Sequence, residues 1–170
     1  MFSLNTRAPT ICLYDYIMDP SIIEEISLGT KKKRDVTYYH HTETSPKHDF
    51  IKDICSSFLT DNGFKHNKEE WFMDVIRYNL DEDTKRVESG LAWHCENDNY
   101  PNVITVLMYL RIDETLIDAN IRYKDREGVK QVIPLKSGTT IIMDGDVPHK
   151  PQDPYGTGRR DLIIMSFKKE

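Results

Sequence analysis

The chain has 170 residues, of which 38% are hydrophobic and 30% are charged, and its net charge is −5. A chain of this length is expected to form a single domain, residues 1–170, around one buried core. Its acidic balance argues against a nucleic-acid partner, because proteins that bind nucleic acid usually present a basic surface.

Residues 1–70 are expected to be a helical region that supports the rest of the domain. Asp19-Pro20 is typical of a helix start, and Gly29 of the end of that helix. A second helix is predicted to begin at Ser45-Pro46 and to stop at Gly63. Its apolar residues recur at helical spacing, so they indicate a face that packs on the core. These residues are Phe50, Ile51, Ile54, Cys55 and Phe58.

Two charged segments each allow two interpretations. Lys31-Lys32-Lys33-Arg34 is either a patch for phosphate groups or, as is commoner for such runs, a solvated loop. The segment from Asp81 to Gly90 is either a solvated connection or a flexible lip over the mouth of a pocket.

Residues 71–170 are expected to form a β-rich core. Val103 to Leu110 is an apolar run with β-branched and aromatic residues, which is typical of a core strand. Gly138 to Met143 predicts another strand, ending at the turn pair Asp144-Gly145. The apolar run from Leu162 to Phe167 predicts the last strand of the chain.

Three residues at the edges of these strands are candidate metal ligands. His94 and Glu96 are two positions apart, so on a β-strand their side chains would point the same way and Cys95 would point away. His149, shortly after the turn, supplies a second imidazole. Two imidazoles and one carboxylate leave open positions on iron(II) for a chelating co-substrate and for oxygen. Asp98 has the same strand parity and is the alternative carboxylate ligand.

The segment from Tyr78 to Phe167 resembles the catalytic core of the iron(II)- and 2-oxoglutarate-dependent dioxygenases, in a small, prolyl-hydroxylase-like form. The matching pieces, in family order, are Arg77-Tyr78, Trp93-His94-Cys95-Glu96, Leu107-Met108-Tyr109-Leu110, Gly138 to Gly145, His149-Lys150-Pro151 and Gly158-Arg159-Arg160. Glu96 is a departure, because most members carry Asp there. The resemblance implies a mainly β fold with N-terminal helices (α+β), built on a double-stranded β-helix or jelly-roll barrel. The helices would pack on the outer face of its larger sheet.

The resemblance also implies an arginine that binds the distal carboxylate of 2-oxoglutarate, for which a planar guanidinium is well suited. Arg159 and Arg160 are adjacent, so only one of them can point inward from a strand. The family pattern of glycine, any residue and arginine begins at Gly158 and favours Arg160. Tyr78 and Tyr109 are either hydroxyl donors to the same co-substrate or ordinary packing aromatics.

The activity that the resemblance implies is oxidative decarboxylation of 2-oxoglutarate to succinate, coupled to hydroxylation of a substrate. Its cofactors would be iron(II), 2-oxoglutarate as co-substrate and O2, with no catalytic residues beyond the metal ligands. A peptide side chain or a small molecule is the expected substrate, and a nucleobase is the less favoured one. The alternative from another class is a catalytically silent barrel that only binds a partner.

The cysteines and the terminus bear on location. Cys12, Cys55 and Cys95 are odd in number and widely spaced, a pattern unlike a disulfide framework or a zinc ribbon. They indicate a reducing compartment, which also suits a ferrous site. The N-terminus has no charged segment followed by a long apolar stretch, and no apolar run approaches the length of a membrane span. We therefore expect a soluble, intracellular, cytoplasmic protein without membrane contact.

Overall fold

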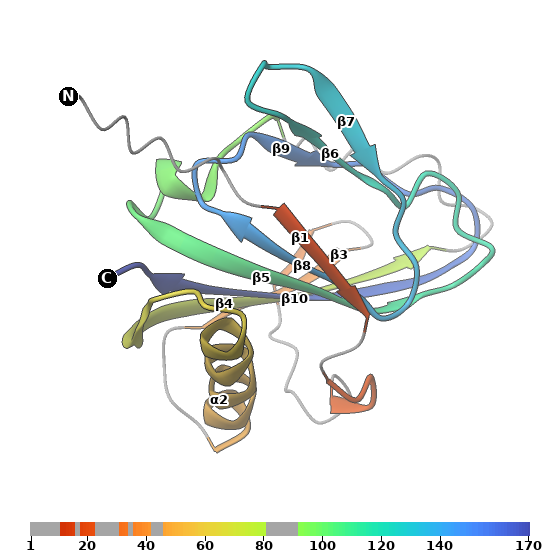
Figure 1. Ribbon diagram of the computed structural model, residues 1–170. Helices are drawn as coiled ribbons and strands as arrows, with labels where there is room; N and C mark the ends of the chain where they lie inside the picture. The colour runs from red at the N-terminus through yellow and green to blue at the C-terminus, as the bar shows by residue number, and fades with distance from the viewer. Residues whose placement is uncertain (1–10, 16–17, 23–30, 34–35, 42–45, 81–91) are drawn as a thin grey trace.

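The computed structural model describes residues 11–15, 18–22, 31–33, 36–41, 46–80 and 92–170, as shown in Figure 1. For residues 31–33, 36–41, 46 and 47 it describes the backbone alone. Within these ranges the regular structure is mainly β, with two antiparallel sheets and the helix α2 (Pro46–Asp61).

The larger sheet has seven strands and the smaller sheet has three. In spatial order the larger sheet contains β1 (Ile11–Asp15), β8 (Thr139–Asp144), β5 (Val103–Ile112), β10 (Gly158–Lys168), β4 (Asn67–Leu80), β3 (Val36–His41) and β2 (Lys31–Lys33). The smaller sheet contains β7 (Lys130–Ile133), β6 (Ile121–Lys124) and β9 (His149–Pro151). From β5 onward the chain passes back and forth between the sheets, because β5, β8 and β10 belong to the larger one and β6, β7 and β9 to the smaller. The result is a jelly-roll-like β-sandwich, so the prediction of a mainly β fold is confirmed.

The larger sheet is buried on both faces, which explains the long apolar runs of its central strands. On one face Ile163 of β10 belongs to the same cluster as Ile51 of α2. On the other face Leu162 belongs to a cluster with Ile121 of the smaller sheet. Figure 1 shows α2 and the smaller sheet on opposite sides of the larger sheet. The helix therefore stiffens the outer face, and the space between the sheets is left for a site.

The helix α2 agrees with the second predicted helix, and of its predicted apolar face Ile51 and Cys55 are fully buried. Phe50 differs, because 52% of it is exposed to solvent. Of the first predicted helix, Asp19 accepts a hydrogen bond from the Ser21 amide at its Oδ1, as an N-cap residue does. Residues 23–30 of that helix lie outside the described part.

Residues 1–70 contain the strands β1, β2 and β3 in addition to α2, so the predicted helical region is in part β. These short strands are held by pairing with distant strands, β1 with β8 and β3 with β4, which local patterns do not reveal. The segment from Asp81 to Gly90 falls outside the described residues, as does Arg34 of the basic run. No helix in the described part is both long and apolar enough to cross a membrane.

Candidate functional site

The side chains of His94, Glu96 and His149 converge on one point beside β9. Each offers one ligand atom, and these atoms all lie within 4.8 Å of one another. Oε1 of Glu96 is 4.0 Å from Nε2 of His94 and 3.5 Å from Nε2 of His149. Metal–ligand bonds of about 2.1 Å at right angles would place such atoms about 3 Å apart, so small side-chain movements close the set around an ion.

The backbone around His94 and Glu96 is not the continuous strand that was predicted. His94 pairs with His149 through two backbone hydrogen bonds, of 3.1 Å and 2.9 Å, at the free edge of β9. The chain then turns at once into the 3-10 helix η1 (Glu96–Asp98). The explanation from strand alternation is therefore wrong, and it is the turn into η1 that directs Glu96 toward the two imidazoles.

Both imidazole rings are oriented by backbone carbonyl groups. Nδ1 of His94 lies 3.0 Å from the carbonyl oxygen of Ala92, and Nδ1 of His149 lies 3.0 Å from that of Val147. Because a carbonyl oxygen only accepts, each Nδ1 must carry the hydrogen, which leaves the lone pair on Nε2. Metal-binding histidines are commonly held in this way, and here both lone pairs are available beside the Glu96 carboxylate.

Cys95 and Asp98, on either side of Glu96, have structural roles. Oδ2 of Asp98 accepts a 2.9 Å hydrogen bond from the Cys95 amide, and it is not part of the converging group. The Cys95 thiol donates to the carbonyl oxygen of Asp146 at 3.5 Å. Burial, followed by the charges of Asp98 and Asp146, raises the pKa of Cys95, so the thiol stays protonated at neutral pH. Of the two carboxylates, Glu96 and not Asp98 lies beside the imidazoles.

Glu96 is held by a backbone clamp that sequence reasoning missed. The Asn97 amide donates to the carbonyl oxygen of Gly145 at 2.8 Å, and Oδ1 of Asn97 accepts from the Val103 amide at 3.0 Å. The Gly145 amide in turn donates to the carbonyl oxygen of Val103 at 2.9 Å. The only signal in the sequence was the turn pair that contains Gly145. The clamp ties η1 to the ends of two core strands, and so it fixes the position of Glu96.

Gly145→Ala is expected to weaken iron(II) binding roughly tenfold, which is typical when support of a ligand is lost. An added Cβ would lie 2.7 Å from Cγ2 of Val103 and 2.8 Å from its carbonyl oxygen, and closer still to Asn97. The overlap should also lower the free energy of unfolding by about 1–3 kcal/mol. Metal titration measures the iron(II) affinity, and denaturant unfolding measures the free energy of unfolding. Asp146→Ala, at the exposed neighbouring position, should change neither, and unchanged iron affinity in Gly145→Ala would disprove the clamp.

Arg160 is a buried cation on the inner face of the larger sheet. It is 1% exposed and stands opposite Tyr78 in the pairing of β10 with β4. Its guanidinium carbon lies 4.1 Å from the centre of the Tyr78 ring, and its Nη1 donates to the carbonyl oxygen of Gln152 at 3.2 Å. Its Nε is buried and has no acceptor among the described residues. A buried donor without an acceptor is costly, so this position is suited to an incoming anion.

Arg159 points to the opposite face of β10. Its Nη2 lies 2.5 Å from Oδ2 of Asp161, a fully buried carboxylate that also binds Nε of Arg77 at 2.8 Å. The predicted alternation of the two arginines is therefore confirmed. Arg159 neutralises a buried carboxylate, whereas Arg160 faces the interior.

Tyr109 completes the surroundings of Arg160. Burial raises the pKa of Tyr109 to about 12, against the opposing effect of the Arg160 charge, so its phenol remains protonated at neutral pH and can donate a hydrogen bond. Tyr78 and Tyr109 belong to the same inner cluster as Val147, whose carbonyl group orients His149. The two tyrosines near Arg160 and the residue that orients His149 thus share one buried cluster.

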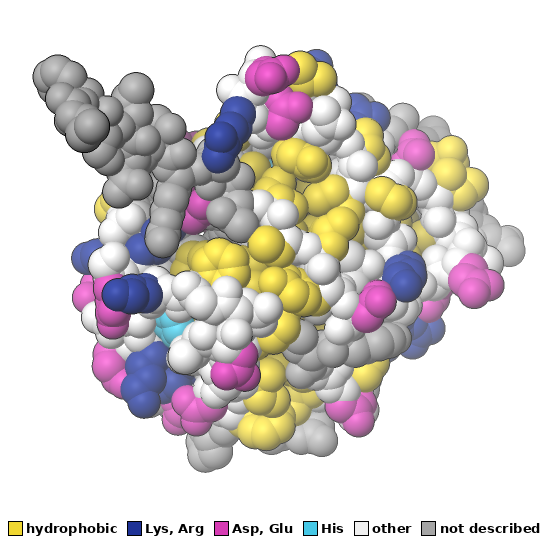
Figure 2. Space-filling view, in the orientation of Figure 1, with side chains coloured by type: hydrophobic (Ala, Val, Ile, Leu, Met, Phe, Trp, Pro, Cys, Tyr) yellow, Lys and Arg dark blue, Asp and Glu magenta, His cyan; other side chains and the backbone are white. Residues whose placement is uncertain are grey.

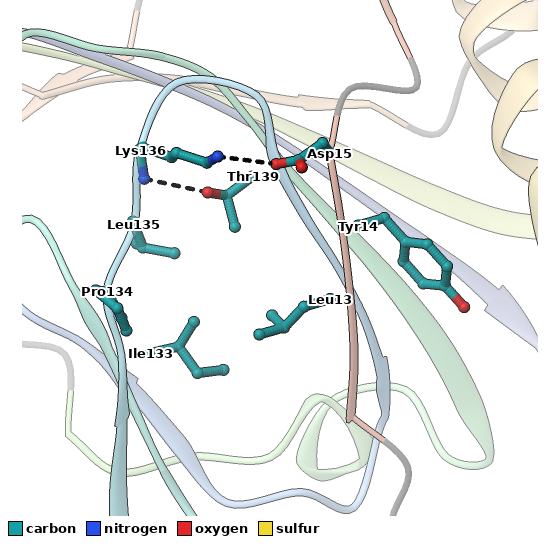
Figure 3. A pocket seen from close by; sticks show the side chains of 8 residues that line it. All are labelled: Leu13, Tyr14, Asp15, Ile133, Pro134, Leu135, Lys136 and Thr139. Atoms are coloured by element: carbon teal, nitrogen blue, oxygen red, sulfur yellow. Dashed lines mark hydrogen bonds and ion pairs between the residues drawn. The ribbon is translucent and has the colours of Figure 1, made fainter.

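A cavity of about 410 Å³ opens between the sheets beside β1 (Figure 3). Its walls are mainly apolar, from Leu13, Ile133 and Leu135, and a Lys136–Asp15 ion pair of 3.2 Å lies at one end. Figure 2 shows that hydrophobic side chains gather across this face of the molecule. His94, Glu96 and His149 do not line this cavity.

Comparison of sequences and of structures gives different results. No family model and no curated protein matches this sequence. The structure is similar to a prolyl-4-hydroxylase from Pseudomonas putida, with a TM-score of 0.61 and 11% identity over 94% of this chain and 92% of that chain. It is also similar to HygX from Streptomyces hygroscopicus, which was solved with nickel and 2-oxoglutarate bound. Here the TM-score is 0.61, with 11% identity over 94% of this chain and 82% of that chain. It is also similar to a 2OG-Fe(II) oxygenase family member from Burkholderia pseudomallei, with a TM-score of 0.59 and 11% identity over 81% of this chain and 68% of that chain.

The chain therefore has the fold of the 2-oxoglutarate- and iron(II)-dependent oxygenases. At this level of identity the similarity shows the fold, and the chemistry has to be argued from the residues of the site.

Proposed function

We propose that this protein is an iron(II)- and 2-oxoglutarate-dependent dioxygenase that hydroxylates a substrate while converting 2-oxoglutarate to succinate. The observation that carries the proposal is the convergence of His94, Glu96 and His149, with both Nε2 lone pairs beside one carboxylate. Two imidazoles and a carboxylate with open positions are the ligand set typical of non-heme iron oxygenases.

The strand order supports a double-stranded β-helix. The backbone bridge between His94 and His149 adds the chain around His94 to the edge of the smaller sheet, next to β9. Four strand positions, at His94, β9, β6 and β7, then stand against four strands of the larger sheet, β4, β10, β5 and β8. In this arrangement the two histidines would come from the edge of the smaller sheet, Glu96 from η1 beside it, and the buried arginine from the larger sheet.

The surroundings of Arg160 support 2-oxoglutarate as co-substrate. Its distal carboxylate would accept hydrogen bonds from Nε of Arg160 and from the hydroxyl groups of Tyr78 and Tyr109. Burial of a carboxylate is costly unless a cation is buried with it, and Arg160 already supplies that cation.

When bound, iron and 2-oxoglutarate would supply oxidation of a C–H bond by O2. The contribution of the chain is positional. Two backbone carbonyl groups fix the imidazoles, the Asn97–Gly145 clamp holds Glu96, and apolar neighbours such as Leu107 and Leu162 exclude water from the interior.

We propose a peptide side chain as the substrate ahead of a small molecule, and both ahead of a nucleobase. The prolyl-4-hydroxylase with the same fold carries in its name a reaction on a prolyl residue, which supports the first choice. We also propose an intracellular, reducing location, because Cys12, Cys55 and Cys95 are free thiols.

The test is slow succinate formation in the absence of a substrate. Protein with iron(II), 2-oxoglutarate and air should release succinate, and the His149→Ala variant should release none. If the wild-type protein binds both iron and 2-oxoglutarate but yields no succinate, the protein is a silent binding module and the proposed activity is wrong.

A further inference from the structure

We propose that the outer face of the smaller sheet docks an acidic segment of a polypeptide partner. Ile121, Tyr123, Ile133 and His149 point from this sheet toward the core, so the alternate residues point outward. We call the outward residues the basic face. They are Trp93, Arg122, Lys124, Lys130, Val132 and Lys150.

The charges of the basic face are unbalanced. Arg122 stands opposite Lys150, and Lys124 stands opposite Lys130. None of these four cations forms an ion pair with a described residue, whereas elsewhere Lys52, Lys136, Lys168 and Lys169 each do. Like charges directly opposite each other destabilise a sheet. In a chain with a net charge of −5, an uncompensated group of cations on one sheet face indicates an anionic partner.

Trp93 supplies an apolar anchor within these charges. The ammonium groups of Lys124 and Lys130 lie 5.1 Å and 5.9 Å from the centre of its ring. These cation–π contacts hold the two long side chains over the sheet. Aromatic residues, Trp among them, are enriched at the centres of protein interfaces.

The geometry favours a polypeptide over a single-stranded nucleic acid. Same-face residues on a strand, such as Arg122 and Lys124, are about 7 Å apart, which equals the spacing of alternate side chains in an extended peptide. Binding of single-stranded nucleic acid relies on several aromatic residues that stack successive bases. The basic face has one, Trp93, and its other apolar residue is Val132, which is 54% exposed.

The basic face lies on the reverse side of the strands that carry the proposed ligands. Trp93 precedes His94 and Lys150 follows His149, so a docked segment would bring its polypeptide next to the site. Binding there does not depend on the proposed activity, because it needs neither metal nor 2-oxoglutarate. Peptide binding by the metal-free protein therefore tests this proposal separately from the proposed activity.

The test uses the metal-free full chain and a short fluorescent peptide of alternating Glu and Ser. Fluorescence anisotropy should show binding that weakens as salt is added, since these charges are exposed. The double variant Lys124→Glu with Lys130→Glu should lose at least about tenfold in affinity. The control is Lys65→Glu with Lys68→Glu, which changes the net charge equally at exposed positions near the start of β4.

Equal thermal midpoints of the two double variants would show that both are folded. Equal losses of affinity in both would overturn the proposal, because the effect would then be one of net charge. A single-stranded oligonucleotide of similar length that binds more tightly than the peptide would overturn it in favour of a nucleic acid. Absence of any peptide binding at low salt would also overturn it.

Discussion

Replacing His149 with alanine is expected to abolish stoichiometric iron(II) binding while the protein remains folded. The variant removes one of the two imidazoles beside Glu96, and a remaining pair of ligands holds a divalent ion far more weakly. The bridge to His94 survives, because it uses backbone atoms of residue 149 and not its side chain. The measurement is an anaerobic titration with iron(II) and 2-oxoglutarate, followed by the visible charge-transfer band of the chelate.

Asp98→Ala is the matched control for this experiment. Its carboxylate caps the Cys95 amide and faces solvent, so iron binding should remain nearly intact. If His149→Ala binds iron with unchanged affinity, the three-residue assignment is wrong. If binding is lost in Asp98→Ala and kept in Glu96→Ala, the carboxylate ligand is Asp98.

Arg160→Ala should weaken 2-oxoglutarate binding far more than Arg159→Ala. Loss of one partner from a buried charge pair costs about 3–5 kcal/mol, which corresponds to a hundredfold or greater loss of affinity, on the order of 10²–10³. Arg160 is buried and faces the interior, whereas Arg159 is bound to Asp161 on the other face. Dissociation constants for 2-oxoglutarate are measured anaerobically in the presence of iron(II).

Stability measurements and the variant Arg160→Lys serve as controls for the comparison of the two alanine variants. Arg159→Ala leaves Asp161 paired with Arg77, so it should lower stability more than co-substrate binding, and unfolding is measured in parallel. Arg160→Lys keeps the charge but loses the planar fork, so its affinity should fall between wild type and Arg160→Ala. Iron affinity should change little in all three variants. The reverse ranking of the two alanine variants would place the co-substrate on the other face of β10.

Local patterns predicted the elements whose burial is simple. The helix α2 was predicted from its apolar spacing, and β5, β8 and β10 from continuous apolar runs, because these strands are covered on both faces. The short strands β1, β2 and β3 were missed. Their residues contact one or two neighbouring strands, and such pairing is a property of distant segments.

The candidate site divides in the same way. The residue types, their order and their alternation along β10 are written in the sequence, and from them His94, Glu96 and His149 were predicted as metal ligands and Arg160 as the inward-facing arginine. The sequence did not show how Glu96 reaches the imidazoles. The chain leaves the strand at η1 and is held there by the clamp through Asn97 and Gly145.

The sequence by itself thus indicated the candidate ligand residues, the inward-facing arginine and the mainly β class, since each depends on residue chemistry or on a period of two or 3.6. The tertiary structure alone decided which carboxylate joins the imidazoles, which group accepts from each Nδ1, and that Arg159 is bound to Asp161. It also decided that four cations share one face of the smaller sheet. The physical reason is that these contacts join segments far apart in the chain, and backbone carbonyl groups, which accept many of them, leave no mark in the order of side chains.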